Sequence, residues 1–244
     1  MHFYGMREAP AISLRDRGSL VVAQQLSVHT IRSELQTPAL AALIRNRPSY
    51  PSRRRVIVAL DIERSTSRPD RVKAELRTML YELFDAALRS AGVHTGRRDR
   101  FIDRGDGLLA LIDPAEQALL LNRVVPVFSQ VLTSYNASLP DPGRRQRQLR
   151  VRAVMHTGEI HDDDNGCFGE ALDIAFRLLD APRVKTALQA AHGPLLLVVS
   201  SDVYDSVVRH SAGGTAHTAF RRLVTAKVAG NEHQGWIHLP LAAA

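Results

Sequence analysis

The sequence predicts an α+β fold, in which helices pack against a mostly antiparallel sheet. Short apolar runs of strand length recur along the chain, as in residues 56–60 and 108–112. Between them, residues 70–90 place apolar side chains at three- and four-residue steps, which is typical of an amphipathic helix. From residue 55 onward, strand-like and helix-like segments follow one another without an internal repeat.

The composition is that of a globular protein. The chain has 244 residues and a 45% apolar fraction, enough for one large or two small domains with a buried core. No apolar run is long enough to span a bilayer, and residues 1–4 do not begin a signal peptide. The single Cys167 excludes an internal disulfide and a cysteine-based zinc site. We therefore expect a cytoplasmic protein without a membrane segment.

Residues 1–54 form a predicted basic leader and linker, and residues 55–244 form the predicted folded domain. Residues 1–55 contain nine arginines against three acidic residues, so six of the seven net positive charges lie there. Such a leader could contact nucleic acid, an acidic partner or a triphosphate, or be a solvated arm. No basic stripe is interleaved with aromatic residues, so we do not expect a dedicated nucleic-acid site.

The first half of the domain predicts a strand, a helix and a hairpin. A buried strand at about 55–61 precedes the helix at 70–90, which Ala91-Gly92 ends. A strand ending near Ile102 is expected to pair with 107–112 across a glycine-flanked turn. Asp113-Pro114 then opens a second long helix to about Tyr135, with a kink expected at Pro126.

The second half predicts further strands and helices. After a loop at 138–148, a strand at 149–156 leads into a turn through Gly158 and an acidic loop at 161–166. Helices at 169–180 and 183–191, a strand at 195–199, a helix at 201–209 and strands near 218–228 and 235–239 complete the domain. The order β-α-β-β-α-β with these additions is typical of a ferredoxin-like sandwich, with helices on one face of the sheet.

Two aspartates lie at the ends of apolar runs. Asp61 follows residues 56–60, and Asp106 lies between two glycines just before residues 108–112. Carboxylates at neighbouring strand ends suit a site that holds divalent metal against phosphate. Taken singly, Asp61 could cap a turn, and Asp106-Gly107 could be an ordinary hairpin turn.

Four blocks together resemble the class III nucleotidyl cyclase catalytic domain, the adenylate/guanylate cyclase homology domain. In order they are residues 60–66 (LDIERST), 104–107 (RGDG), 152–159 (RAVMHTGE) and 169–178 (GEALDIAFRL). The resemblance extends from about residue 55 to residue 240. It implies an enzyme in which the ribose 3′-hydroxyl attacks the α-phosphate of a nucleoside triphosphate, and pyrophosphate leaves.

The resemblance also implies the metal site. Asp61 and Asp106 would bind two Mg²⁺ or Mn²⁺ ions, with the carbonyl of Ile62 as a further ligand. Ser65 and Thr66 would lie beside the triphosphate, although a polar turn explains them equally well.

The catalytic residues implied by the family are Arg177 and Asp173. Arg177 matches the arginine that stabilises transition-state charge on the α-phosphate, although a solvated helix residue is the alternative. The family usually has asparagine where this chain has Asp173, which could pair with Arg177 one helical turn away. Lys227 is placed like the lysine that binds the terminal phosphates, or is an ordinary strand lysine.

The residues that select a purine in the family are absent. Ile102 and Gly166 occupy these positions. The bacterial pyrimidine cyclases of antiphage defence share the fold and also lack these residues, so cUMP or cCMP synthesis stays open beside cAMP and cGMP. The family's shared site implies a homodimer, in which Asp61 and Asp106 of one chain work with Asp173, Arg177 and Lys227 of the other.

Two other functions compete with the cyclase. A catalytically degenerate cyclase-homology domain could bind nucleotide and act as a regulatory module, which Asp173 and the missing base selectors favour. A diguanylate cyclase or polymerase-type palm shares the two-aspartate arrangement. It requires an acidic doublet, however, and Gly107 follows Asp106 here.

Overall fold

The computed structural model of the chain describes residues 50–209 and 219–238, so most of the predicted leader lies outside the described residues. Strand β1 (Ser52–Ile62) lies between β3 (Gly107–Ile112) and β4 (Val151–Asp163) and is antiparallel to both. The two-residue strand β2 (Ile102–Asp103) pairs with the other edge of β3. This 2-3-1-4 order confirms the predicted ferredoxin-like block and the predicted β2–β3 hairpin.

Three more strands extend the sheet to the order β2-β3-β1-β4-β6-β8-β7. β6 (Leu195–Ser200) is parallel to β4, and β8 (Asn231–His238) is antiparallel to β6. β7 (Phe220–Val228) forms the edge and pairs with β8. β8 begins earlier than residue 235, because Ala229 and Gly230 have positive φ angles and make a tight hairpin turn.

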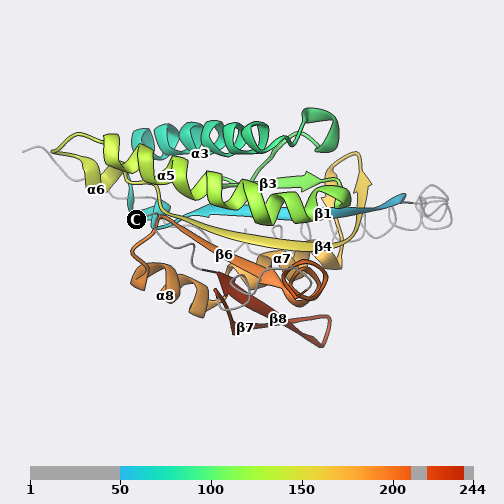
Figure 1. Cartoon of the computed structure of the whole chain (residues 1–244). Coiled ribbons are helices and arrows are strands. Elements are labelled where there is room, and N and C mark those ends of the chain that lie inside the picture. The colour runs from blue at the N-terminus through green and yellow to red at the C-terminus, as the bar shows by residue number, and fades with distance from the viewer. Residues whose placement is uncertain (1–49, 210–218, 239–244) are drawn as a thin grey trace, which may run out of the picture. The chain divides into compact units, whose positions relative to one another are not determined.

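One face of the sheet is covered by α3 (Asp70–Ala91) and α5 (Val125–Ser138), as Figure 1 shows. The residues of β1 buried on this face alternate along the strand, as the period of two requires: Val56, Val58 and Leu60. The predicted helix at 70–90 is confirmed, and Gly92 ends it in the left-handed conformation.

The other face carries helices too, which differs from the single helical face that we expected. α7 (Glu170–Leu179) and α8 (Pro182–Ala190) pack there (Figure 1) and bury the alternate β1 residues Ile57 and Ala59. The five-residue apolar run of β1 is therefore buried on both faces.

The second long helix is divided into several turns. A 3₁₀ turn over Pro114–Glu116, capped by the Asp113 carboxylate, leads into α4 (Gln117–Leu119) and a π turn over Leu120–Val124. α5 then begins at Val125. The kink expected at Pro126 stays a prediction, but a π turn does precede this proline, whose nitrogen has no hydrogen to donate to the preceding turn.

Strand β4 does not turn at Gly158, and this prediction is wrong. The strand continues to Asp163 and then forms a hairpin with β5 (Gly166–Phe168). Gly158 is needed because α7 crosses the strand there. A Cβ on Gly158 would lie 2.5 Å from the Cβ of Ala171.

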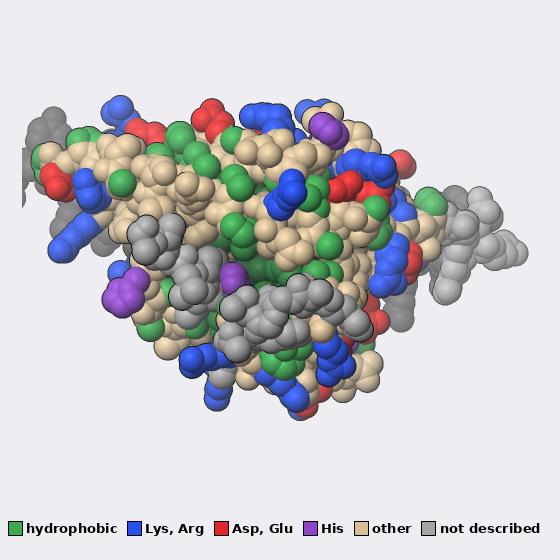
Figure 2. Space-filling model, viewed as in Figure 1, with side chains coloured by type: hydrophobic (Ala, Val, Ile, Leu, Met, Phe, Trp, Pro, Cys, Tyr) green, Lys and Arg blue, Asp and Glu red, His purple; other side chains and the backbone are tan. Residues whose placement is uncertain are grey.

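Two predicted segments differ in detail. The loop at 138–148 contains the short helix α6 (Arg144–Arg147), and the predicted helix at 201–209 consists of α9 (Ser201–Val203) followed by a π turn over Tyr204–Val208. None of the described helices has the length and apolar character that crossing a membrane requires. Over the face seen in Figure 2, basic and acidic side chains are interspersed.

Candidate active site

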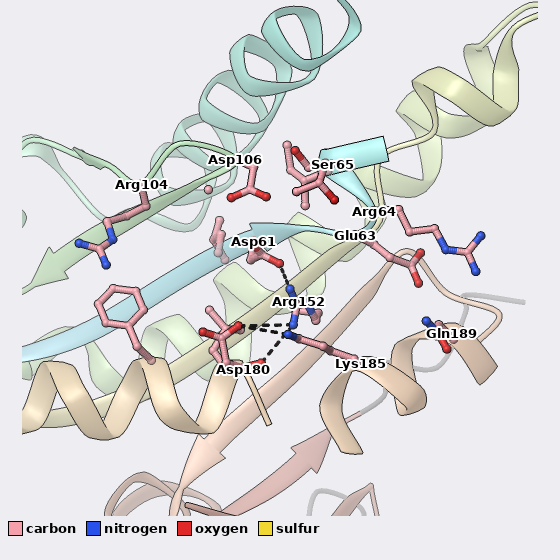
Figure 3. Close-up of a pocket in the computed structure, with 16 residues that line it drawn as sticks. Asp61, Glu63, Arg64, Ser65, Arg104, Asp106, Arg152, Asp180, Lys185 and Gln189 are labelled. Carbon is pink, nitrogen blue, oxygen red and sulfur yellow. Dashed lines mark hydrogen bonds and ion pairs between the residues drawn. The ribbon is translucent and has the colours of Figure 1, made fainter. Parts of the chain in front are cut away.

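A pocket of about 530 Å³ opens at the end of β1, where this strand meets the β2–β3 turn and the α7–α8 corner. Figure 3 shows Asp61 and Asp106 in its middle. The charged side chains around it balance in number, four basic and four acidic. The basic residues are Arg64, Arg104, Arg152 and Lys185, and the acidic residues are Asp61, Glu63, Asp106 and Asp180.

The antiparallel pairing of β1 and β3 brings the two aspartates together. Asp61 is paired with Gly107, the residue after Asp106, and the amide of Ile62 donates to the carbonyl of Asp106 over 3.2 Å. A Cβ on Gly107 would lie only 2.0 Å from the carbonyl oxygen of Leu60. Glycine at this position therefore lets the Asp106 turn approach the end of β1.

Asp61 is held in a largely buried position. Burial raises its pKa to about 6, the positive charge of Arg152 opposes this rise, and the charge of Asp106 adds to it. Asp106 lines the same pocket as Asp61, so both carboxylates border one cavity. The predicted convergence of Asp61 and Asp106 on one pocket is thus present in the structure.

Arg152 is the main feature of the pocket that the sequence did not predict. It lies on β4 directly opposite Asp61, and its guanidinium donates to the Asp61 carboxylate. The same guanidinium lies 3.8 Å from the carboxylate of Asp180 and 3.4 Å from the carbonyl of Leu179. Only 9% of Arg152 is exposed. In the sequence, the feature that could have indicated its role is a charged residue within an apolar strand segment.

The donors of the pocket fit a magnesium-like cation. Asp61 and Asp106 supply carboxylate oxygens, and Ile62 lines the pocket while its side chain is buried in the core, so its backbone faces the pocket. The described residues hold no cluster of three or more His, Cys, Asp or Glu side chains suited to a metal. A set of one or two carboxylates completed by substrate phosphates is how Mg²⁺ is usually held. A cation here would compete with Arg152 for the Asp61 carboxylate.

The segment after Asp61 forms the opposite wall of the pocket. Arg64 has a positive φ of 55°, and Ser65–Ser67 form a 3₁₀ turn. Both Ser65, which is 5% exposed, and Thr66 line the pocket. Behind them, Glu63 accepts a hydrogen bond of 2.8 Å from Arg150. The two predicted substrate-binding hydroxyl residues thus lie beside the aspartates.

The other three predicted site residues lie elsewhere. Asp173 and Arg177 are exposed on α7, and Lys227 is exposed on β7. None of them lines the pocket that Asp61 and Asp106 share. Asp173 and Arg177 form no ion pair with each other in the described part of the chain, although they are one helical turn apart.

Further residues of the pocket come from α7, α8 and the β2–β3 turn and were not predicted. Arg104 lies over the ring of Phe176, with its guanidinium carbon 4.3 Å from the ring centroid. Lys185 lies 3.7 Å from Asp180, and Gln189 lines the same end of the pocket as Arg64 (Figure 3). Ile102, which the resemblance places at a base-selecting position, packs against the core cluster that includes α7.

No protein-family model and no curated protein matches this sequence. Solved structures do match. An adenylate/guanylate cyclase/hydrolase from Silicibacter pomeroyi is 21% identical, with a TM-score of 0.54 over 79% of this chain and 99% of that one.

Two guanylyl cyclases are also similar. The guanylyl cyclase Cya2 is 14% identical, with a TM-score of 0.54 over 78% of this chain and 94% of that chain. The guanylate cyclase domain of RhGC from Catenaria anguillulae, in complex with GTP, is 12% identical, with a TM-score of 0.52 over 77% and 97%. The chain therefore has the fold of adenylate/guanylate cyclase catalytic domains, which confirms the resemblance at the level of the fold.

Proposed function

We propose that this chain is a nucleotidyl cyclase, which converts a nucleoside triphosphate to a 3′,5′-cyclic nucleotide and pyrophosphate at a homodimer interface. The observation that carries the proposal is the shared pocket of Asp61 and Asp106, formed by neighbouring strands within a cyclase-type fold. In the reaction, the ribose O3′ releases its proton to solvent and forms a bond to the α-phosphorus, and the bond from that phosphorus to the leaving pyrophosphate oxygen breaks.

Asp61, Asp106 and the carbonyl of Ile62 would hold two Mg²⁺ or Mn²⁺ ions. Such ions would lower the pKa of the ribose hydroxyl and neutralise charge on the leaving group. Ser65 and Thr66 would donate hydrogen bonds to phosphate oxygens, and the buried position of Ser65 keeps its hydroxyl fixed on the wall of the pocket.

The charge balance of the pocket supports a need for cations. The four basic and four acidic side chains that line it leave no excess positive charge for a triphosphate. Added divalent ions would supply that charge and would release Arg152 from Asp61. Arg152 would then keep Asp180, which already lies 3.8 Å away, as its partner.

A second copy of the chain would complete the site. Asp173, Arg177 and Lys227 are exposed and lie outside their own chain's pocket, so they are free to face the pocket of a partner. The guanylyl cyclase domain of the RhoGC fusion protein from Blastocladiella emersonii, with a TM-score of 0.51, forms a dimer, although a non-canonical one. Arg177 would place its planar charged group on the α-phosphate, and Lys227 would bind the terminal phosphates.

The product assay is the direct test. The protein is incubated with ATP, GTP, CTP and UTP in Mn²⁺, and products are identified by mass spectrometry. We expect a 3′,5′-cyclic nucleotide and pyrophosphate from at least one substrate, and loss of both products in Asp106→Asn. A matched control, Asp164→Asn in the exposed β4–β5 turn, should retain the wild-type yield. No cyclic product from any of the four triphosphates would contradict the proposal.

One observation favours a second candidate, a nucleotide-binding regulatory module. Arg152 already neutralises Asp61, and Asp173 replaces the asparagine usual in the family, so the site could bind nucleotide without turning it over. Calorimetry of triphosphate binding with Mg²⁺ or Mn²⁺, beside the product assay, separates the two. Binding without product favours the regulatory module.

A further inference from the structure

Two basic side chains mark the two ends of the pocket. Figure 3 shows Arg104 at one end and Arg64 at the other, with Asp61 and Asp106 between them. Arg64 belongs to the wall that carries Ser65 and Thr66. A triphosphate bound along that wall, with its α-phosphate at the aspartates, would direct its nucleoside toward the Arg104 end.

The guanidinium of Arg104 is held in place by an aromatic ring. It lies 4.3 Å from the centroid of Phe176, on α7, while Arg104 itself belongs to the turn that carries Asp106. A guanidinium attracted to the face of a ring keeps its N–H groups at the edge of its plane, where they can still donate. The Phe176 ring thus orients Arg104 without using its hydrogen-bond donors.

These donors have no partner in the described residues, where the Arg104 side chain makes no hydrogen bond or ion pair. Of the other two arginines that line the pocket, Arg152 binds Asp61, and Arg64 lies at the opposite end, where no aromatic ring of the described residues lies against it. At this end of the pocket the other described lining residues offer no oriented side-chain donor, since Phe176 is apolar and Gly107 has no side chain. Arg104 is therefore the oriented donor group at the nucleoside end.

We propose that Arg104 recognises the base of the nucleotide, and that it favours bases with two neighbouring acceptor atoms. This inference rests on the proposed function, because it places a nucleoside triphosphate in the pocket. A guanidinium donates two parallel hydrogen bonds to guanine O6 and N7, and cytosine offers a similar pair in O2 and N3. Adenine presents an amino donor beside each acceptor on those edges, so Arg104 selects against ATP.

Arg104 could instead bind a phosphate, and relative rates separate the two roles. A phosphate contact contributes equally to all four triphosphates, whereas a base contact contributes only to the preferred ones. We therefore compare kcat/KM and equilibrium binding for ATP, GTP, CTP and UTP in the wild type, Arg104→Met and Arg104→Lys. Arg104→Met keeps an apolar stem on Phe176, and Arg104→Lys keeps the charge but loses the planar fork.

In both variants, kcat/KM and affinity for the preferred nucleotides should fall roughly 5- to 150-fold while the values for ATP change little. The matched control is Arg64→Met at the opposite end, where all four nucleotides should weaken by the same factor. An equal loss for all four nucleotides in the Arg104 variants, or no loss, would overturn the inference. So would a wild type that binds all four bases equally.

The equilibrium binding measurements distinguish a failure of this inference from a failure of the proposed function. They use non-reacting α,β-methylene triphosphates and need no turnover. If no cyclic product forms, the cyclase proposal fails, and the base preference measured by binding still decides the role of Arg104. If product forms without base preference, the cyclase stands and Arg104 has no role in selection.

Discussion

The guanidinium of Arg152 lies against the carboxylate of Asp61, its direct partner in the pairing of β4 with β1. The side chains are 11% and 19% exposed, so both charges are largely removed from water. A buried charge that loses its partner is strongly destabilising. The pocket is thus arranged so that Asp61 has a cation beside it before any metal binds.

Replacement of Arg152 should make the stability of the protein depend more strongly on bound metal. Arg152→Met should lower the free energy of unfolding by about 3 kcal/mol, because Asp61 loses its partner. Mn²⁺ should then raise the melting temperature of Arg152→Met more than that of the wild type, since it binds without displacing a guanidinium. The matched control is Arg150→Met, which breaks the neighbouring pair with Glu63. Equal Mn²⁺ shifts in wild type and Arg152→Met would refute this account of Arg152.

Metal binding should depend on pH through Asp61. Burial raises its pKa to about 6, so the carboxylate is ionised above that pH and protonated below it. Mn²⁺ affinity without nucleotide should therefore fall by about tenfold for each pH unit below 6. The contribution of Asp61 to the free energy of unfolding changes in the opposite direction from the Mn²⁺ affinity. Because its carboxyl pKa is raised in the folded state, this contribution favours folding as the pH falls. Titration calorimetry from pH 7.5 to 5 tests this, and Asp61→Asn should lose this part of the pH dependence.

His156 should make the fold sensitive to acid. It is 3% exposed, and its Nδ1 lies 2.8 Å from Ser200 Oγ. Burial lowers its pKa to about 4, against 6.5 for the ordinary side chain, so the unfolded chain takes up the proton first. The stabilisation is complete above pH 6.5 and is lost toward pH 4, by an amount approaching 3 kcal/mol.

Urea unfolding at pH 7.5 and 4.5 measures this effect. The stability difference between wild type and His156→Gln should shrink by about 2 to 3 kcal/mol at the lower pH. His94→Gln, at an exposed position, is the control and should follow the wild type at both values. Parallel losses in wild type and His156→Gln would show that His156 is not responsible.

A shared active site should allow two inactive variants to complement each other. Asp61→Asn and Arg177→Ala, each inactive alone, should recover about a quarter of wild-type activity when mixed, because half the dimers are mixed and each has one intact site. Asp61→Asn mixed with Asp106→Asn should stay inactive, since every site then lacks one aspartate. No recovery in the first mixture, with mixed dimers demonstrated, would place Arg177 outside the partner's site.

The elements fixed by local pattern could be predicted from the sequence. The spacing of apolar residues in α3 and the glycines around Asp106 are visible within a few positions, and they gave the helix and the β2–β3 hairpin. Asp61 and Asp106 came from their positions at strand ends and from the cyclase resemblance. The strand-end positions and the motifs of the resemblance can each be recognised within a short stretch of the sequence.

The parts that were missed depend on contacts between distant segments. Arg152 and Asp61 are 91 positions apart, and their pairing follows from the register of β1 on β4, which no local pattern encodes. Gly158 was taken for a turn because glycine is common in turns, whereas it serves the packing of α7 on β4. Arg104 and Phe176 meet for the same reason, across the corner between the β2–β3 turn and α7.

The central claim is that Asp61 and Asp106 hold the same pair of cations. The test is a measurement of Mn²⁺ binding by electron paramagnetic resonance, with an α,β-methylene triphosphate present. It compares the wild type with Asp61→Asn, Asp106→Asn and the double variant. We predict two Mn²⁺ per site in the wild type, at least a roughly tenfold loss of affinity in each single variant, and a double variant little worse than either. Unchanged binding in Asp106→Asn, or losses that simply add in the double variant, would mean that the carboxylates act separately and would contradict the account.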